Sequence, residues 1–86
     1  MPESITIIVP TEGKQIEVEV EPYHTPKDII DLVISQLKLR SGEWILTLGS
    51  KEITSSDTRT LGEIGVRNGD VLHLMPRVIG GYVGNI

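Results

Sequence analysis

The stretch that decides the fold runs from Ser4 to Glu21 and reads SITIIVPTEGKQIEVEVE. Its first part, Ser4 to Val9, is rich in β-branched residues and has the length of a strand. From Gln15 to Glu21, Ile and Val alternate with Gln and Glu, as in a strand with one buried and one solvated face. Pro10 and the turn residues Thr11 to Lys14 separate the two strands. The stretch therefore predicts an antiparallel β-hairpin.

A single long helix is predicted after the hairpin, from Pro26 to about Lys38. Thr25 before Pro26 reads as an N-cap followed by a first-turn proline, and Asp28 places an acid near the positive end of the helix. Ser41-Gly42 breaks the pattern. The helix carries a broad apolar stripe that must pack against a sheet: Ile29, Ile30, Val33, Ile34 and Leu37.

The second half of the chain predicts shorter elements. A strand is expected at Trp44–Leu48, followed by a tight turn at Gly49-Ser50 and a short strand at Lys51–Ile53. One helical turn with inward-facing ends is expected at Leu61–Ile64. An Asn-Gly turn at Val66–Asp70 then leads to the last strand at Val71–Met75. In the last strand, Leu72 and Leu74 are expected to face the core, because side chains alternate with a period of two.

These elements predict an α+β fold with a mixed sheet of four to five strands packed on one main helix. The first and last strands both carry strong apolar runs, so we expect them to be parallel neighbours at the centre of the sheet. That arrangement is the β-grasp. The predicted domain covers residues 1–76, followed by a flexible tail over 77–81 and a C-terminal extension over 82–86.

The composition is that of one small soluble domain. A chain of 86 residues has no room for two cores. Its net charge of −4 argues against a nucleic-acid or acidic-membrane surface. No apolar run approaches the ~20 residues of a membrane span, and residues 1–4 lack the features of a secretion signal. We therefore predict a cytoplasmic protein with no nucleic-acid or membrane partner.

Catalysis, metal binding and cofactor binding are not expected within this domain. The chain has no Cys, which excludes a thiol nucleophile and a Cys-based zinc site. His24 falls in a loop and His73 in a strand, and the spacing gives neither a catalytic partner. No glycine-rich phosphate loop follows a strand and opens a helix. The remaining chemistry is surface recognition.

One small apolar patch is predicted on the exposed face of neighbouring strands, made by Leu46, His73 and Met75. Met is an adaptable side chain that recurs on surfaces binding several partners. The alternative is that Leu46 belongs to the core and Met75 is a scattered exposed residue.

The chain also carries two adjacent glycines, Gly80-Gly81, on a short arm beyond the last predicted strand. Glycine has no Cβ, so such an arm can enter a narrow enzyme tunnel that side chains would block. The alternative is an ordinary frayed terminus.

The sequence resembles the ubiquitin family over nearly its whole length. The matching segments follow in corresponding order: Gly13-Lys14, Val20-Glu21-Pro22, Thr25, Arg59-Thr60-Leu61, Leu72-His73-Leu74, Arg77 and Gly80-Gly81. Other segments are similar to the bacterial YukD branch of ubiquitin-like proteins: Tyr23-His24, Ile30-Asp31, Gly42-Glu43-Trp44-Ile45 and Gly65-Val66-Arg67-Asn68-Gly69-Asp70.

The resemblance implies a protein modifier. In such systems an activating enzyme uses ATP to adenylate the diglycine carboxylate, a conjugating enzyme carries it as a thioester, and an amine on a target protein receives it. The resemblance assigns conjugation to Gly81, with Gly80 as its required neighbour and Arg77 as a contact for the activating enzyme. It places Leu46, His73 and Met75 at the family's apolar recognition patch.

Two departures from ubiquitin indicate a prokaryotic relative, bacterial or archaeal. The first turn reads Pro10-Thr11-Glu12, so the leucine that ubiquitin contributes to the patch is absent. Ile79 replaces the basic residue before the diglycine.

Five residues follow the diglycine, and they imply a precursor that is cut between Gly81 and Tyr82. Related prokaryotic systems use a JAMM-type metalloprotease, in which zinc-bound water attacks the peptide bond. The alternative is that conjugation never occurs, and that Tyr82, Val83 and Ile86 dock on a groove or on a neighbouring copy's sheet edge, giving self-association.

Four lysines are candidate acceptors for another copy of the chain: Lys14, Lys27, Lys38 and Lys51. Lys51 lies near the position of a chain-forming lysine in ubiquitin. The alternative for each is a solvated surface charge.

Two further functions compete with the modifier. A β-grasp sulfur carrier is adenylated at its diglycine and receives sulfur as a thiocarboxylate, although such carriers usually end at the diglycine. A YukD-like interaction module serves a secretion system without conjugation, and the diglycine counts against it.

Overall fold

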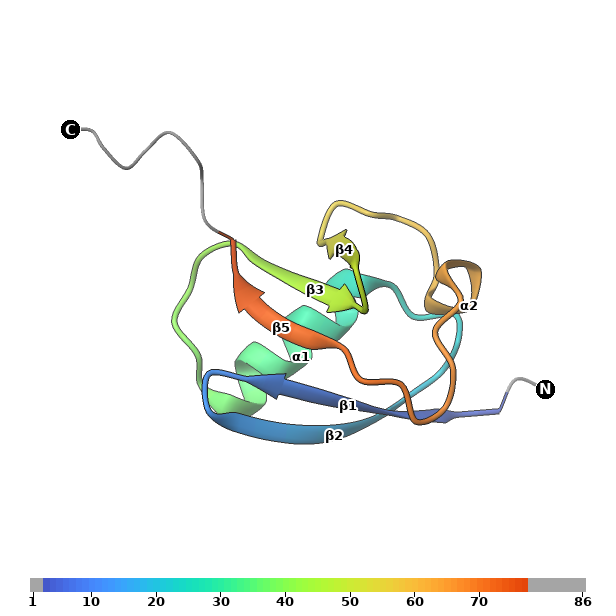
Figure 1. Cartoon of the computed structure of the whole chain (residues 1–86), viewed down its shortest axis with the longest axis horizontal. Coiled ribbons are helices and arrows are strands. Elements are labelled where there is room, and N and C mark those ends of the chain that lie inside the picture. Colours follow the sequence, from blue (N-terminus) through green and yellow to red (C-terminus); the bar gives the residue numbers. More distant parts are fainter. Residues whose placement is uncertain (1–2, 78–86) are drawn as a thin grey trace.

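The computed structural model describes residues 3–77. Within that range the elements follow in the order shown in Figure 1: β1 (Ile5–Thr11), β2 (Lys14–Val20), α1 (Pro26–Leu37), β3 (Trp44–Leu48), β4 (Lys51–Thr54), α2 (Leu61–Ile64) and β5 (His73–Pro76). The predicted α+β fold is confirmed.

The first hairpin extends further than predicted. Strand β1 pairs with β2 from Ile5 opposite Val20 to Thr11 opposite Lys14, so it continues through Pro10. A proline is tolerated at position 10 because the edge of β1 that faces away from β2 is bonded only near Thr6 and Ile8. At position 10 no backbone donor is needed on that edge. The reversal falls on Glu12 and Gly13, both with positive φ, as a two-residue hairpin turn requires.

Strands β1 and β5 are parallel neighbours, as predicted. Ile8 forms a parallel bridge with Val71: its N–H donates to the Asp70 carbonyl at 2.9 Å, and its own carbonyl accepts from the Leu72 N–H at 2.9 Å. This bridge joins the β1–β2 hairpin to the sheet β4-β3-β5. The predicted last strand is therefore divided, because the bridge at Val71 joins it to β1 whereas His73–Pro76 pairs with β3.

Helix α1 lies across one face of the strands (Figure 1). The Thr25 N–H donates to Asp28 Oδ2 at 3.0 Å at its start. The helix ends at Leu37, one residue before the prediction, because Lys38 takes the left-handed C-cap conformation with φ of 54°. Ile29, Ile30 and Val33 are buried against the sheet, whereas the last turns of the stripe, at Ile34 and Leu37, are half-buried.

The single turn α2 completes the core. Leu61 and Ile64 are both buried, as predicted. The Leu61 N–H donates to the His24 carbonyl at 2.8 Å, which fixes α2 to the loop before α1. Neither helix within residues 3–77 is long and apolar enough to cross a lipid bilayer.

Candidate recognition surfaces

The outward face of β3 and β5 is the first candidate surface. His73 and Met75 are both exposed, the latter with 39% of its surface accessible, while Leu72 and Leu74 face the core as predicted. Val71 is also exposed beside them. Two of the three predicted patch residues therefore lie on one accessible face.

The third predicted patch residue, Leu46, does not lie on this face. Its surface is 0% exposed, it pairs with Leu74, and it belongs to the core cluster. The prediction placed Leu46 on the wrong face of β3. Trp44, Leu46 and Leu48 point inward on this strand, toward the helix.

The β3 side chains that share the outward face with β5 are Ile45 and Thr47. They stand directly opposite Met75 and His73 in the antiparallel ladder, and directly opposite residues project to the same side. Ile45 is only 7% exposed but lies outside the core cluster. Ile45 was not predicted from the sequence, because four of the five residues of β3 are apolar and alternation alone does not show which face is buried.

Arg77 follows the last paired residue of β5. Its N–H donates to the Glu43 carbonyl at 2.9 Å, and its guanidinium lies 4.0 Å from the Glu43 carboxylate. Both side chains are more than half exposed, so solvent screens this pair strongly. The role predicted for Arg77 stays a prediction. Gly80, Gly81 and Tyr82 lie outside the described residues.

All four candidate acceptor lysines are exposed: Lys14, Lys27, Lys38 and Lys51. Two are engaged. Lys27 Nζ lies 2.6 Å from the Asp31 carboxylate, whose hydrogen bond raises the pKa of that amine. Lys51 Nζ donates to the Ile64 carbonyl at 3.3 Å. Their acceptor roles stay predictions.

The two histidines differ in surroundings. His24 Nδ1 accepts the Glu21 N–H at 3.0 Å, and its ring lies 4.6 Å from the Tyr23 ring. His24 thus stabilises the loop between β2 and α1. No hydrogen bond within residues 3–77 joins either imidazole to a hydroxyl group, and these residues contain no cluster of His and acidic side chains suited to a metal ion.

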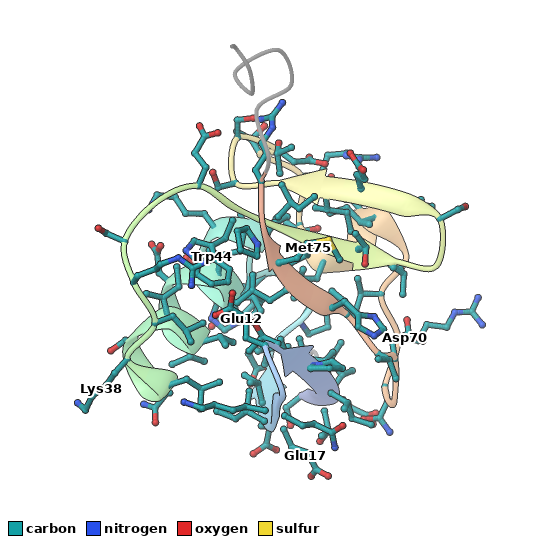
Figure 2. The ribbon with its side chains drawn as sticks, turned by 60° about the vertical axis from the view of Figure 1, so that its left-hand side comes forward. Glu12, Glu17, Lys38, Trp44, Asp70 and Met75 are labelled. Atoms are coloured by element: carbon teal, nitrogen blue, oxygen red, sulfur yellow. The ribbon has the colours of Figure 1, made fainter. Side chains whose placement is uncertain are left out.

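Arg40, in the loop after α1, contacts the side chains of Glu12 and Trp44, both of which are labelled in Figure 2. Its guanidinium donates to both carboxylate oxygens of Glu12, at 3.0 and 3.1 Å, and lies 5.2 Å from the centre of the Trp44 ring. Trp44 Nε1–H donates to the Arg40 carbonyl at 3.1 Å. These contacts link the turn at Glu12 to the loop after α1 and to the start of β3, although solvent screens the exposed Arg40–Glu12 ion pair.

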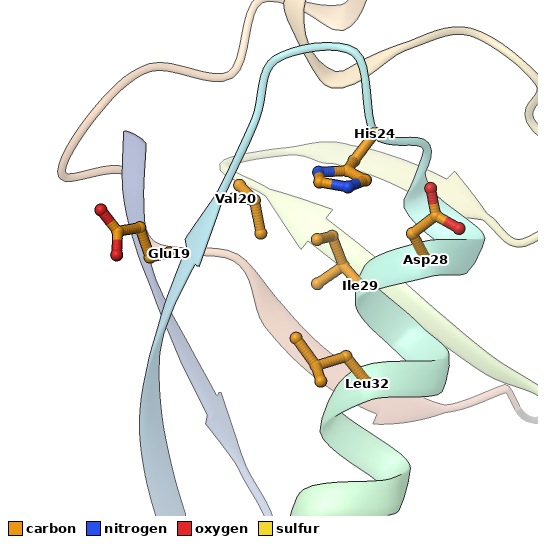
Figure 3. A pocket seen from close by; sticks show the side chains of 6 residues that line it. All are labelled: Glu19, Val20, His24, Asp28, Ile29 and Leu32. Atoms are coloured by element: carbon orange, nitrogen blue, oxygen red, sulfur yellow. The ribbon is translucent and has the colours of Figure 1, made fainter. Parts of the chain in front are cut away.

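The second candidate surface is a groove between β2 and α1, which the sequence analysis did not predict. It encloses about 260 Å³ and is lined by Glu19, Val20, His24, Asp28, Ile29 and Leu32 (Figure 3). Small-molecule sites are usually larger, roughly 300–1,000 Å³. The size of the groove suits an inserted side chain better than a cofactor.

This fold, with its central parallel pair of strands and one crossing helix, defines a ubiquitin-like β-grasp protein. Its structure is similar to Caldiarchaeum subterraneum ubiquitin, with 29% identity, a TM-score of 0.74, and coverage of 92% of this chain and 100% of that one. It is also similar to a ubiquitin-like domain of an Arabidopsis thaliana protein, at 21% identity and a TM-score of 0.75 over 94% of this chain and 85% of the other. The UBL domain of yeast Ddi1 has 18% identity and a TM-score of 0.74 over 91% and 94% of the two chains.

Within this class, the sequence places the chain more narrowly. Residues 4–74 match YukD, described as the protein YukD of the WXG100 protein secretion system (Wss). The chain therefore belongs to the YukD family. Comparison with curated proteins gives no significant match.

Proposed function

We propose that this chain is a ubiquitin-like protein modifier that is joined to amines on target proteins through the carboxylate of Gly81. The observation that carries the proposal is the diglycine beyond a complete β-grasp. Strand β5 ends at Pro76, so Gly80-Gly81 follows the domain after only a few residues. A glycine acyl group presents no side chain to the attacking thiol or amine.

The folded body would act by recognition. The exposed His73 and Met75, with Ile45 and Thr47 beside them, form the surface that we assign to partner proteins. The partners implied are an activating enzyme that uses ATP, a conjugating enzyme, a JAMM-type metalloprotease that cuts after Gly81, and the targets. The domain itself carries no catalytic role in this proposal.

A second function is favoured by the family match. YukD is described as a protein of a secretion system, and residues 4–74 match it without including the diglycine. A module of this kind would bind secretion proteins non-covalently. Its outward β3–β5 face would serve in recognition, and residues 78–86 would need no processing.

Mass spectrometry of the chain recovered from the cells that produce it tests the two functions. The chain carries an affinity tag before Met1 and is purified under denaturing conditions, which retain only covalent adducts. A Gly81→Val variant is compared with Asn85→Ala, a control substitution on the far side of the predicted cleavage site. The modifier function predicts species ending at Gly81 and adducts on other proteins, both lost in Gly81→Val and kept in Asn85→Ala.

Two other results would contradict conjugation. Replacement of one carboxylate oxygen by sulfur at Gly81, without protein adducts, would indicate a sulfur carrier. The non-covalent module would be indicated by a different result. All chains would end at Ile86 and carry no adduct, but they would bind secretion proteins under native conditions.

A further inference from the structure

The open edge of β2 and the groove beside it are left unused by the functions above. Within residues 3–77, β2 pairs with β1 alone, so one edge of the strand keeps free backbone donors and acceptors. Such an edge accepts an added strand, and side chains of that strand alternate between the two faces of the sheet. An added strand here would project every second side chain toward α1.

The inward side of this edge is mostly apolar, although His24 and Asp28 also line the groove. Val20 and Ile29 form the buried floor of the groove, and Leu32, which is 37% exposed, forms its open wall. Figure 3 shows these three side chains facing one another between β2 and α1. The groove is therefore suited to one aliphatic side chain from an added strand.

The outward side of the same edge is acidic. Glu17 and Glu19 are exposed on β2, and Figure 3 shows Glu19 on the opposite side of the strand from the helix. Glu19 Oε2 accepts a hydrogen bond from the Ser4 hydroxyl at 2.8 Å and stays accessible. Directly opposite side chains on neighbouring strands lie roughly 5 Å apart. The preferred neighbour of Glu19 is therefore a cation.

The chain itself contains a cation followed directly by an aliphatic residue that could fill these two positions. Arg77 is followed by Val78 and Ile79, both β-branched and favourable in strands. With Arg77 outward beside Glu19, Val78 projects inward to the groove. We propose that Arg77–Ile79 of one copy adds to the β2 edge of a second copy, with Arg77 against Glu19 and Val78 against Leu32.

The contact must join two molecules. The Arg77 N–H is bonded to the Glu43 carbonyl of its own chain, which fixes Arg77 at the end of β5. In the order β2-β1-β5, a strand added outside β2 lies three strand spacings from β5, or about 14 Å. Val78 reaches only about 3.5 Å beyond Arg77. Because the donor and acceptor surfaces differ, the association is head-to-tail and continues into longer oligomers or rings.

Sedimentation equilibrium of the full chain tests this proposal without any conjugation enzyme. The contact is small, so we measure the weight-average mass from roughly 10 μM to 1 mM, where weak interfaces associate. We expect the mass to rise with concentration. Arg77→Glu, Glu19→Lys and Leu32→Lys should each weaken association by about fivefold. The double charge reversal Arg77→Glu/Glu19→Lys should restore it.

Two control variants separate this contact from a change in net charge. Arg67→Glu changes the net charge by the same amount as Arg77→Glu, at an exposed site away from the contact. Ser35→Lys places a cation on the exposed side of α1 outside the groove, whereas Leu32→Lys places one within it. Both should associate like the parent chain. As a second measurement, a synthetic peptide of residues 76–81 should shift the amide resonances of Val20, Ile29 and Leu32, and a peptide with Val78→Asp should not.

The proposal is overturned if the parent chain is monomeric throughout the concentration range. It is also overturned if association survives Leu32→Lys and Arg77→Glu. A third result would also overturn it: association that persists in Arg77→Glu but is lost when residues 82–86 are removed. The groove would then be assigned to residues 82–86. Because no enzyme is present, none of these results depends on whether Gly81 is conjugated.

Discussion

Replacing Thr11 by valine should stabilise the protein. Thr11 is the last residue of β1, and its side chain is turned toward the core with only 4% of the residue exposed. Its Oγ1 is buried and has no hydrogen-bond partner among the described residues. A buried hydroxyl without a partner is desolvated in the folded state and keeps its hydrogen bonds to water in the unfolded state. Valine has nearly the same shape without that loss.

The size of the effect follows from the cost of the unpaired group. Burying a hydroxyl without a hydrogen bond costs about 1–3 kcal/mol in proteins, so Thr11→Val should raise the free energy of unfolding by about 1 kcal/mol. For a domain of this size, 1 kcal/mol raises the melting temperature by roughly 4–8 °C. With a urea m-value of about 1 kcal/mol/M, the unfolding midpoint should rise by about 1 M.

Urea unfolding followed by circular dichroism measures this change, with Thr47→Val as the matched control. Thr47 also lies in a strand, but it is half-exposed on the outward face, where its hydroxyl reaches solvent. The control should change the free energy of unfolding by less than about 0.5 kcal/mol. Equal or lower stability of Thr11→Val than the parent would mean that the hydroxyl is hydrogen-bonded after all, and the reasoning would fail.

Two further predictions concern the corrected patch and an ion pair. Leu46→Ala should lower the free energy of unfolding by about 2–5 kcal/mol, because it opens a cavity in the core, whereas Met75→Ala on the exposed face should lower it by less than about 1 kcal/mol. Comparable urea midpoints for the two variants would place Leu46 outside the core. The Arg59 guanidinium and N–H, which both donate to Asp57, lower the pKa of that carboxyl from 3.8 to about 2. Folding thus lowers this pKa, so the ionised Asp57 stabilises the fold above about pH 4, and that contribution is lost as pH falls toward 2. In NMR titration of the Arg59→Ala variant, the midpoint of the Asp57 carboxyl should rise toward 3.8, but not completely, because the backbone donor remains. The midpoint should be unchanged in the control variant Arg67→Ala. An unchanged Asp57 midpoint in Arg59→Ala would contradict the assignment.

Most of the fold was predictable because its signals are local. The alternation over Gln15–Val20 sets both the strand and its buried face, and Thr25-Pro26 sets the start of α1. Leu61 and Ile64 were placed correctly because a single helical turn with two apolar ends has one way to bury them.

The phase of β3 was not predictable in the same way. Four of the five residues from Trp44 to Leu48 are apolar, so alternation alone gives no preferred face. Pairing with β5, which sets Leu46 against Leu74, decides which side is buried. The groove between β2 and α1 was missed for a related reason: its residues come from two elements whose spacing is set only by the packing of the helix on the sheet.

The bridge between Ile8 and Val71 sets the order in which the domain can fold during synthesis. Translation delivers β1 first, but its central neighbour in the sheet exists only after residues 71–76 have been made. Until then, the edge of β1 that faces away from β2 is open to pairing with other chains. Closure of the domain therefore waits for residues 71–76, and β1, which pairs with β2 earlier, is not bonded on both of its edges until then.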